Sequence, residues 1–461
     1  MEKTDFYGRL LPVSQGEQAL TGEERLLLAK NALLFWYREK KRQLPWRETA
    51  DGYHIWISEI MLQQTRVEAV KPYYARFMEH FPTVWALAGA SDEELLKCWE
   101  GLGYYSRARN LKKAAAVIAE QYGGCLPSSY EELLKLPGIG SYTAGAIGSI
   151  AYGLPVPAVD GNVLRVLSRV TASREDILKQ QTRRKMEALV SGVLKKMVLQ
   201  ESEAKAGSAE EESDFAEREE NFAEESEKPK EGLGYSAGAQ AGSGAVQESF
   251  AGVQRGSEKE PGKPEKAQGS LAGDFNQALI EIGAMVCVPN GAPLCVQCPF
   301  RTVCLAAIHG LTGEIPVRSP KKKRKIEEKT VLLLEYEDKI AIRKRREGGL
   351  LASLYEFPNL SGVLKEQQVE DLFSGNIRSL HELPGAKHIF SHTEWHMNGY
   401  FLSLKEPETA CLETGESGEE PILFVEWKEL TERYPLPGAF SAYRKILENY
   451  LSSRHQVSLE E

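Results

Sequence analysis

Apolar residues recur at three- and four-residue intervals through residues 22–200, and Gly or Pro separates the repeats. This spacing predicts amphipathic helices. Few stretches alternate between apolar and polar positions as half-buried strands do, so this part of the chain is predicted to be all-α. The expected helices are Glu23–Lys40, Trp56–His80, Ser91–Leu96, Arg107–Tyr122, Ser128–Leu134 and Ser141–Tyr152.

The helical pattern stops at residue 201 and resumes near residue 272. Residues 201–271 are rich in Glu, Ser, Ala, Gly and Lys and poor in branched apolar side chains. Such a segment cannot bury enough surface to offset its ordering entropy. We therefore expect residues 201–271 to be a disordered, low-complexity insertion that divides one helical domain into residues 22–200 and 272–310.

A different pattern follows an expected basic linker over residues 311–328. Stretches rich in β-branched and aromatic residues predict strands, and two segments with helical spacing lie among them. Residues 329–452 are therefore predicted to form a second domain of the α/β class. The expected strands are Val331–Tyr336, Lys339–Arg343, Asn398–Leu404 and Ile422–Trp427, and the expected helices are Lys365–Phe373 and Ala439–Leu451.

The charge of the chain is unevenly distributed. The net charge is −9, but residues 201–230 hold twelve acidic and four basic residues and alone contribute −8. The rest of the chain is nearly neutral, so the net charge does not exclude a nucleic-acid partner. No apolar run approaches the length of a membrane span, and the first residues lack an apolar signal core. We expect a cytoplasmic protein without a membrane partner.

A glycine-rich turn joins two expected helices at Leu136–Thr143. Gly138 and Gly140 let the backbone approach a ligand closely, and the free amides at the start of the second helix can bind a phosphate oxygen. An ordinary connection between two helices is the alternative. The whole Leu-Pro-Gly-x-Gly string favours binding to a nucleic-acid backbone.

Two carboxylates are placed where chemistry is possible. Asp160, in Val159–Val163, lies where the N-cap of a helix belongs, and amides bonded to it favour its charged form. Glu59 lies on an apolar stripe, where burial raises the pKa of a carboxyl group and suits a general acid. The alternatives are a simple helix cap for Asp160, and a solvated residue or an internal ion pair for Glu59.

Four of the seven cysteines cluster with the spacing C-x7-C-x2-C-x5-C. Four close cysteines in a chain without a signal peptide indicate a metal site before a disulfide framework. Four thiolates suit a [4Fe–4S] cluster or a zinc ion, and a loose group of reduced cysteines is the alternative. The cysteines concerned are Cys287, Cys295, Cys298 and Cys304.

Taken in order, these strings closely resemble the A/G-specific adenine DNA glycosylases, the MutY family of helix-hairpin-helix glycosylases. The resemblance covers about residues 24–200 and 273–305 and continues into the second domain, which is similar to the family's Nudix-like domain. The strings that carry the resemblance are Pro45-Trp46-Arg47, Trp56–Gln64, Gly101–Arg107, Leu136–Thr143, Val159–Val163 and the four cysteines.

The resemblance implies a role for each candidate residue. Glu59 protonates adenine, and Asp160 stabilises an oxocarbenium ion with support from Tyr142 and Asn162. Gln64 and Tyr104 enter the duplex beside Leu102 as the adenine flips. Side chains inserted in this way, which we call wedge residues, replace the stacking that the flipped base loses. Tyr104 could instead pack in the core. Arg47 and Gln277 line the adenine pocket. The cysteines hold a [4Fe–4S] cluster, although the family usually has six residues, not seven, in the first gap.

The resemblance also implies the substrate, which is double-stranded DNA with adenine opposite 8-oxoguanine or guanine, bound by a monomer. Phe390, Ser391 and His392 are placed on the 8-oxoguanine side, and a buried hairpin segment is the alternative. The acidic metal-binding box of true Nudix hydrolases is absent. The basic run Lys321–Lys325 suits phosphate contact, nuclear localisation or simple solvation.

Two other functions remain open at this point. The related endonuclease III family has a lysine directly after the hairpin that attacks the sugar and cleaves the backbone. Tyr142 occupies that position here, and a phenol cannot form a Schiff base. A bifunctional glycosylase–lyase is therefore disfavoured. The second alternative is a non-catalytic DNA-binding protein with a structural metal site.

Overall fold

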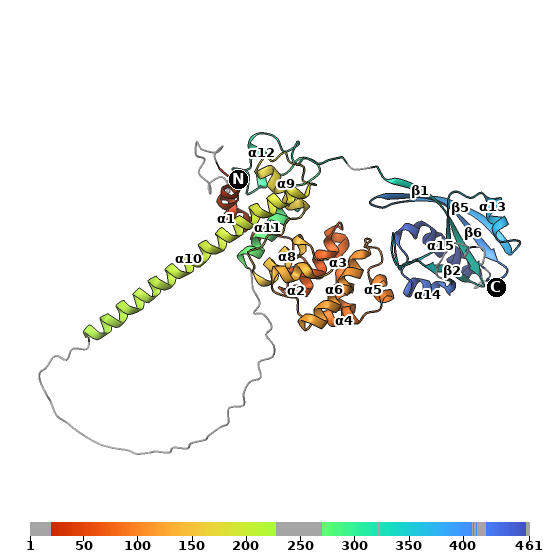
Figure 1. Ribbon diagram of the computed structural model, residues 1–461, viewed down its shortest axis with the longest axis horizontal. Coiled ribbons are helices and arrows are strands. Elements are labelled where there is room, and N and C mark those ends of the chain that lie inside the picture. The colour runs from red at the N-terminus through yellow and green to blue at the C-terminus, as the bar shows by residue number, and fades with distance from the viewer. Residues whose placement is uncertain are drawn as a thin grey trace, which may run out of the picture.

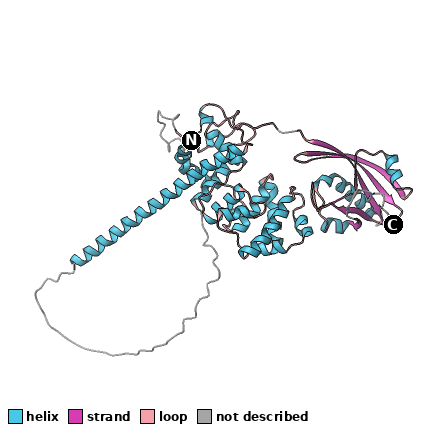
Figure 2. Cartoon of the chain, viewed as in Figure 1, coloured by secondary structure: helices cyan, strands magenta, loops and turns pink. Residues whose placement is uncertain are grey.

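The computed structural model describes residues 20–226, 270–320, 323–407, 409, 412 and 421–457. Helices occupy the first part of the described chain, and a sheet flanked by helices occupies the last part (Figures 1 and 2). Within these residues, no helix combines the length and the apolar character needed to cross a membrane.

The helical domain consists of two lobes, each with its own hydrophobic core (Figure 1). The central lobe is continuous in sequence, and its core side chains lie between Leu44 and Ala151. Its helices are α2 (Gly52–Leu62), α3 (Val67–His80), α4 (Val84–Gly89), α5 (Asp92–Cys98), α6 (Ser106–Tyr122), α7 (Tyr130–Lys135) and α8 (Ser141–Tyr152).

The second lobe is assembled from distant parts of the chain, and we call it the split lobe. Its core combines side chains from residues 26–37, 159–197 and 272–315. Buried apolar residues recur along α1 and α11, and every residue of α9 from Val163 to Val170 is buried, so these helices pack closely together. Its helices are α1 (Gly22–Lys40), α9 (Gly161–Val170), α10 (Gln180–Ser226), α11 (Leu271–Met285) and α12 (Leu305–Ile308).

The prediction of one helix over Trp56–His80 is wrong, because the structure has two helices there. α2 ends at Leu62, α3 begins at Val67, and Gln64 between them has a φ of 60°. A left-handed residue cannot continue a right-handed helix. The apolar spacing continues across the break, so periodicity alone did not reveal it. The break projects Gln64 out of the helical path.

The predicted disordered insertion also needs correction over residues 201–226. The structure continues α10 through this stretch to Ser226. Glu and Ala make up more than half of it, and both are strong helix formers. A low content of apolar side chains therefore does not by itself exclude a helix. Residues 227–269 lie outside the described residues.

The C-terminal domain is a seven-stranded mixed sheet with the order β3-β2-β1-β6-β5, to which β4 and β7 add on β1 and β2. The long strands β1 and β6 run parallel at its centre. The strands are β1 (Lys325–Tyr336), β2 (Lys339–Lys344), β3 (Tyr355–Glu356), β4 (Asn359–Ser361), β5 (Ile377–Ile389), β6 (Thr393–Leu404) and β7 (Ile422–Glu426). The helices are α13 (Glu366–Leu372), α14 (Trp427–Glu432) and α15 (Ser441–Val457).

Two boundaries in this domain differ from the sequence prediction. The predicted linker over 311–328 ends earlier, because β1 begins at Lys325; Lys321 and Lys322 of its basic run lie outside the described residues. β5 was not predicted at all. Among the described strands, β5 pairs only with β6. Most of its side chains are exposed, and the register of its pairing with β6 shifts between Leu383 and Ala386. Such an edge strand lacks the alternating apolar signal.

The C-terminal domain contacts the central lobe directly. Leu354 is fully buried in the core cluster of that lobe. Arg109 Nη1 donates to the carbonyl oxygen of Ala352 at 2.7 Å, and Lys344 forms an ion pair with Glu93 at 2.7 Å. These contacts join the C-terminal domain to the central lobe.

Candidate active site

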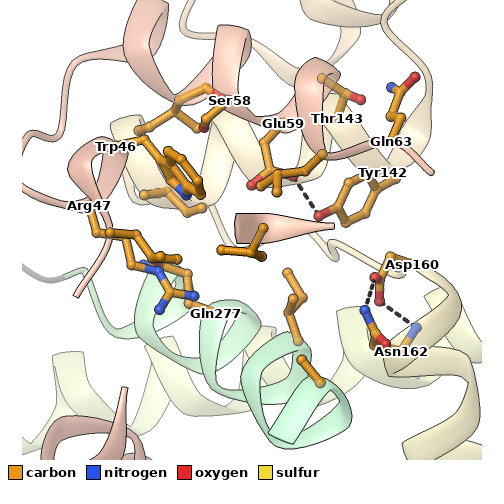
Figure 3. Close-up of a pocket in the computed structure, with 18 of the residues that line it drawn as sticks. Trp46, Arg47, Ser58, Glu59, Gln63, Tyr142, Thr143, Asp160, Asn162 and Gln277 are labelled. Atoms are coloured by element: carbon orange, nitrogen blue, oxygen red, sulfur yellow. Dashed lines mark hydrogen bonds between the residues drawn. The ribbon is translucent and has the colours of Figure 1, made fainter. Parts of the chain in front are cut away.

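A pocket of about 940 Å³ lies between the two helical lobes, with walls from both. α2 and α8 supply the central-lobe wall, while α11 and the start of α9 supply the split-lobe wall (Figure 3). Most residues predicted to act on substrate meet here. The predicted residues that line it are Arg47, Glu59, Gln64, Gly138, Gly140, Tyr142, Asp160, Asn162 and Gln277.

Glu59 is a buried acid on the last turns of α2. Its carboxylate oxygen Oε2 accepts a hydrogen bond of 2.6 Å from the hydroxyl group of Tyr142. Burial raises the pKa of Glu59 to about 7; the Tyr142 bond and the charge of Arg47 oppose the shift, and Asp160 adds to it. Burial also raises the pKa of Tyr142 well above its usual value, so Tyr142 remains a neutral donor. Glu59 can therefore hold a proton near neutral pH.

Asp160 is the N-cap of α9, as predicted. Its Oδ1 accepts hydrogen bonds of 2.8 Å from the amides of Asn162 and Val163, and its Oδ2 accepts one of 2.7 Å from Asn162 Nδ2. Burial raises the pKa of Asp160, while these three hydrogen bonds lower it. Arg165 Nη2 donates to Asn162 Oδ1 at 2.9 Å and so fixes the amide that faces Asp160. Burial therefore raises the pKa of both carboxyl groups, but Asp160 accepts three hydrogen bonds that favour its anion, whereas Glu59 accepts one.

Arg47 is held in the pocket by a buried carboxylate that the sequence analysis missed. Glu281 of α11 is fully buried and accepts hydrogen bonds of 2.8 Å from Arg42 Nε and Arg47 Nη2. Burial alone would raise the pKa of Glu281, but the bonds from the two arginines outweigh it and lower the pKa to about 2. Figure 3 shows Arg47 and Gln277 at one end of the pocket and Asp160 with Asn162 at the other.

The glycine-rich turn lies at the mouth of the pocket. Gly138 has a φ of +77°, and a Cβ there would lie 2.7 Å from Asn110 Cβ. Gly140 is the N-cap of α8 and offers no side-chain acceptor to the first amides of that helix. Those amides suit a phosphate oxygen, because the positive end of the helix dipole lies with them.

Gln64 and Tyr104 lie on two turns that approach one another. Both have left-handed backbones, with φ of 60° and 49°. Tyr104 is 46% exposed, so the alternative that it packs in the core is wrong. Leu102 differs from expectation, because it is 6% exposed and packs in the core of the central lobe. Its side chain has almost no surface to offer DNA.

The segment predicted to face 8-oxoguanine is the turn between β5 and β6. Ser391 and His392 are exposed, and the ring of Phe390 contacts the rings of His388 and Trp395 edge-on at 4.6 and 4.9 Å. The hydroxyl oxygen of Ser391 lies 3.3 Å from that of Tyr104. The two domains therefore place a predicted wedge residue beside a predicted lesion contact.

The four clustered cysteines line one small cavity together with Arg169 and Arg301. Arg169 Nη1 donates to Cys287 Sγ at 3.2 Å. Among the described residues, no set of three or more His, Cys, Asp or Glu side chains is arranged to hold a single metal ion. Four thiolates around one cavity are a donor set that suits a [4Fe–4S] cluster or a zinc ion.

Comparison with known proteins shows which families this chain is similar to. Residues 57–191 match the HhH-GPD family, described as a superfamily of base excision DNA repair proteins, and residues 330–449 match the NUDIX domain. The human adenine DNA glycosylase is 30% identical over 443 residues, covering 82% of this chain and 67% of the human protein. The mouse adenine DNA glycosylase is 30% identical over 486 residues, covering 92% and 78%.

The chain belongs to the adenine DNA glycosylase family. As a member of this family it is a DNA-repair glycosylase with a Nudix-like C-terminal domain, as the sequence predicted. Among solved structures, a thermostable thymine-DNA glycosylase aligns with a TM-score of 0.41 and 20% identity, covering 62% of this chain and 97% of that protein.

Two residues that contact site residues in this adenine DNA glycosylase were not predicted. Glu281 carried a usable signal, since it interrupts the apolar run Ala278–Met285 just as Glu59 interrupts its own stripe. Arg165 carried none, because arginines on helices are usually solvated. Its partners come near only in the fold.

Proposed function

We propose that this glycosylase hydrolyses the bond between adenine and deoxyribose where adenine is mispaired with 8-oxoguanine or guanine. One observation carries the proposal: Glu59, with a pKa of about 7, and the amide-bonded Asp160 share one pocket. Two carboxyl groups whose surroundings separate their pKa values can serve as acid and as anion in the same reaction.

The chemistry divides between these two groups. Glu59 donates its proton to a ring nitrogen of adenine, so the base leaves with the electron pair of the glycosidic bond. Asp160 stabilises the positive charge that develops on the sugar. Water then adds to the sugar carbon, and the Glu59 carboxylate takes up its proton. Tyr142 orients Glu59 through its 2.6 Å hydrogen bond, and Asn162 does the same for Asp160.

The same geometry supports a monofunctional enzyme. Tyr142 lies at the position where a lyase of the related family carries its lysine, and its hydroxyl group is committed to Glu59. A phenol forms no Schiff base with the sugar. The reaction therefore ends at an abasic site with the strand intact.

Base recognition falls to residues around the pocket and in the second domain. Gln64 and Tyr104 fill the space that the flipped adenine leaves, Arg47 and Gln277 line its pocket, and the amides near Gly138 and Gly140 bind the backbone. Phe390, Ser391 and His392 contact the partner base that stays in the helix. One chain thus supplies contacts to both bases and works as a monomer.

We also propose that Cys287, Cys295, Cys298 and Cys304 hold a [4Fe–4S] cluster. Its chemistry here is structural: four thiolate bonds tie the loop after α11 to α12. The cavity that these cysteines share supports this assignment.

A direct assay tests the proposed function. Purified protein is incubated with duplexes that carry adenine opposite 8-oxoguanine, guanine or thymine, and each sample is analysed with and without hot alkali. We expect strand breaks only after alkali, in the order 8-oxoguanine, guanine, thymine. Breaks without alkali would show a lyase, and no breaks at all would overturn the assignment.

The roles of the two carboxyl groups have their own test. Glu59→Gln and Asp160→Asn should each abolish measurable adenine release, because both groups act on the transition state. Neither contacts a phosphate in this arrangement, so binding to the duplex should stay close to wild type. A near-normal single-turnover rate in either variant contradicts its role.

Metal analysis tests the cluster. The purified protein should be brown, with iron well in excess of zinc. Cys295→Ser should weaken DNA binding while the C-terminal domain stays folded. A colourless and active protein loaded with zinc would overturn the cluster assignment.

A further inference from the structure

Arg107, in the first turn of α6, makes an unusual set of contacts. Its Nη1 donates to the carbonyl oxygens of Ile60, Met61 and Gln63 at 2.7, 2.9 and 2.7 Å. Its Nη2 donates to those of Leu102 and Gly103, both at 3.1 Å. One guanidinium group therefore joins the end of α2 and the turn after it to the turn before α6.

These hydrogen bonds hold a charge in the protein interior without an ionised partner. Arg107 is 8% exposed, and its acceptors are five backbone carbonyl oxygens and, at 3.5 Å, the hydroxyl oxygen of Thr65. Burial lowers the pKa of Arg107 to about 10. The guanidinium also stacks over the rings of Trp99 and Tyr104, at 5.3 and 5.5 Å from their centres. Burying a charge is costly, and an apolar side chain could fill this space at lower cost.

The two turns that Arg107 joins are the ones that carry the proposed wedge residues. Gln64 lies in the turn between α2 and α3, which we call the first wedge turn (residues 63–66). Tyr104 lies in the turn between α5 and α6, the second wedge turn (residues 99–105). Left-handed backbones at both residues are strained and persist only where the surroundings hold them. Two of the carbonyl groups that Arg107 binds, those of Gln63 and Gly103, directly precede Gln64 and Tyr104.

We infer that Arg107 is the positioning residue that sets the two strand-opening side chains, Gln64 and Tyr104, at a fixed separation. A planar fork of donors can bind carbonyl groups from two segments at once, which a lysine ammonium cannot do in the same geometry. The contacts to Ile60 and Met61 also fix both turns to α2, the helix that carries Glu59. This role rests on the proposed function, since it concerns how the adenine leaves the helix.

The inference predicts a defect that depends on the substrate. Arg107→Lys should slow single-turnover excision from a fully paired duplex by about a hundredfold, the cost of a small misplacement of groups that must act together. The same adenine placed in a bubble of unpaired bases needs no wedge, and Arg107→Lys should release it at close to the wild-type rate. With 2-aminopurine at the target position, the variant should bind the duplex but give a smaller rise in fluorescence.

Matched variants separate positioning from general damage. Arg109→Lys removes another arginine–carbonyl hydrogen bond from the same helix, and the ratio between the two substrates should not change. In a protein that already carries Gln64→Ala and Tyr104→Ala, Arg107→Lys should slow excision from the duplex only slightly further. The effects of substitutions at residues that act as a unit are not additive. If Arg107→Lys does not fold, Arg107→Gln replaces it, since a neutral amide leaves no buried charge.

The outcomes are distinct. An equal loss on duplex and bubble, or no loss on the duplex, overturns the role of Arg107 while the proposed function stands. A wild-type protein that releases adenine from neither substrate overturns the proposed function itself.

Discussion

Glu59 and Asp160 show how two groups of the same chemistry acquire different roles. Burial acts on both and raises both pKa values. Asp160 receives three hydrogen bonds that favour its anion, whereas Glu59 receives one, from Tyr142. Under the proposed function, Glu59 is the group that holds the proton and donates it to adenine. The rate should rise with pH as Asp160 ionises and fall as Glu59 ionises near pH 7.

Tyr142→Phe should move the descending limb of this pH profile to higher pH. The hydroxyl group of Tyr142 stabilises the Glu59 carboxylate, so its removal raises the pKa of Glu59 further and keeps the acid protonated longer. Single-turnover rates from pH 5 to 9 measure the limb. Tyr152→Phe on the same helix, whose hydroxyl group bonds to the carbonyl oxygen of Leu126, should leave it in place. A limb that moves to lower pH contradicts the assignment of Glu59 as the acid.

The sequence could reveal Glu59 and Asp160 because each carries a local signal. An acid within an apolar stripe and an acid at a helix start can both be recognised from their neighbours. Glu281 and Arg107 act through contacts with residues far from them in sequence. Glu281 accepts from Arg42, 239 residues earlier, and Arg107 donates to Ile60, 47 residues earlier. Local pattern holds no information on such contacts. The burial of Leu102 escaped prediction for the same reason.

Among the helices, α9 and α11 meet at a glycine. A Cβ on Gly283 would lie 2.7 Å from Asn162 Cβ and 2.9 Å from the carbonyl oxygen of Asn162. The backbone of one helix must therefore move if Gly283 gains a side chain. Because Asn162 holds Asp160, the spacing of the two helices sets the position of a proposed catalytic group.

Gly283→Ala should reduce both stability and activity. Overpacking at such a contact typically costs about 1–3 kcal/mol, and displacement of Asn162 should lower the excision rate beyond the loss of folded protein. Gly89→Ala is the matched control, since no atom lies within 4 Å of a Cβ on that exposed helical glycine. Thermal unfolding and single-turnover excision measure the two effects. An unaltered excision rate in Gly283→Ala would show that α9 and α11 can accept the added Cβ without displacing Asn162.

Helices and strands were predicted correctly where the apolar periodicity of the sequence matches the packing in the structure, and incorrectly where the two differ. α8 was predicted with its observed ends, because Gly140 and Gly153 interrupt the pattern on both sides. The break at Gln64 failed because apolar spacing ran through it. β5 failed because an exposed edge strand needs no apolar face.

Removing residues 204–268 and joining the ends with a short Gly-Ser linker should leave adenine excision unchanged. Residues 201–203 are already exposed, and none of the described residues between Arg183 and Ser270 lines the pocket. The deletion must stop before Ser270, because its side chain caps α11 by accepting from the Gly273 amide at 3.0 Å. DNA binding should tighten at low salt, since many acidic side chains are lost. Failure to fold would show that the segment packs on the rest of the protein.

Across the whole molecule, the proposed function assigns the two bases of the mispair to different domains. The helical domain holds all groups proposed for hydrolysis, and the C-terminal domain holds Phe390 and Ser391. 8-Oxoguanine differs from guanine by a carbonyl group at C8 and a proton on N7, so a hydroxyl group can accept from that proton or donate to that carbonyl. The 3.3 Å approach of Ser391 to Tyr104 places this hydroxyl beside the wedge.

Phe390→Ala with Ser391→Ala should therefore shrink the preference for 8-oxoguanine over guanine. A lost contact of this kind is worth on the order of 1–3 kcal/mol, and excision opposite guanine should suffer less. Ser379→Ala on β5 is the control. Residues 1–318 alone should show the same reduced preference and also lower stability, because the contact with Leu354 is gone. An unchanged preference ratio places the lesion contact in the helical domain.

The split lobe also sets the order in which a newly made chain can be completed on the ribosome. Arg25 of α1 donates to the carbonyl oxygen of Val303, 278 residues later. At about 5–20 residues per second, α1 waits roughly 15–55 s for that partner to be synthesised. The central lobe is contiguous and can fold during this interval, whereas α1 still lacks α11, one of the helices that cover its apolar face. The nascent protein therefore depends on protection of that part of α1 until translation has passed Val303.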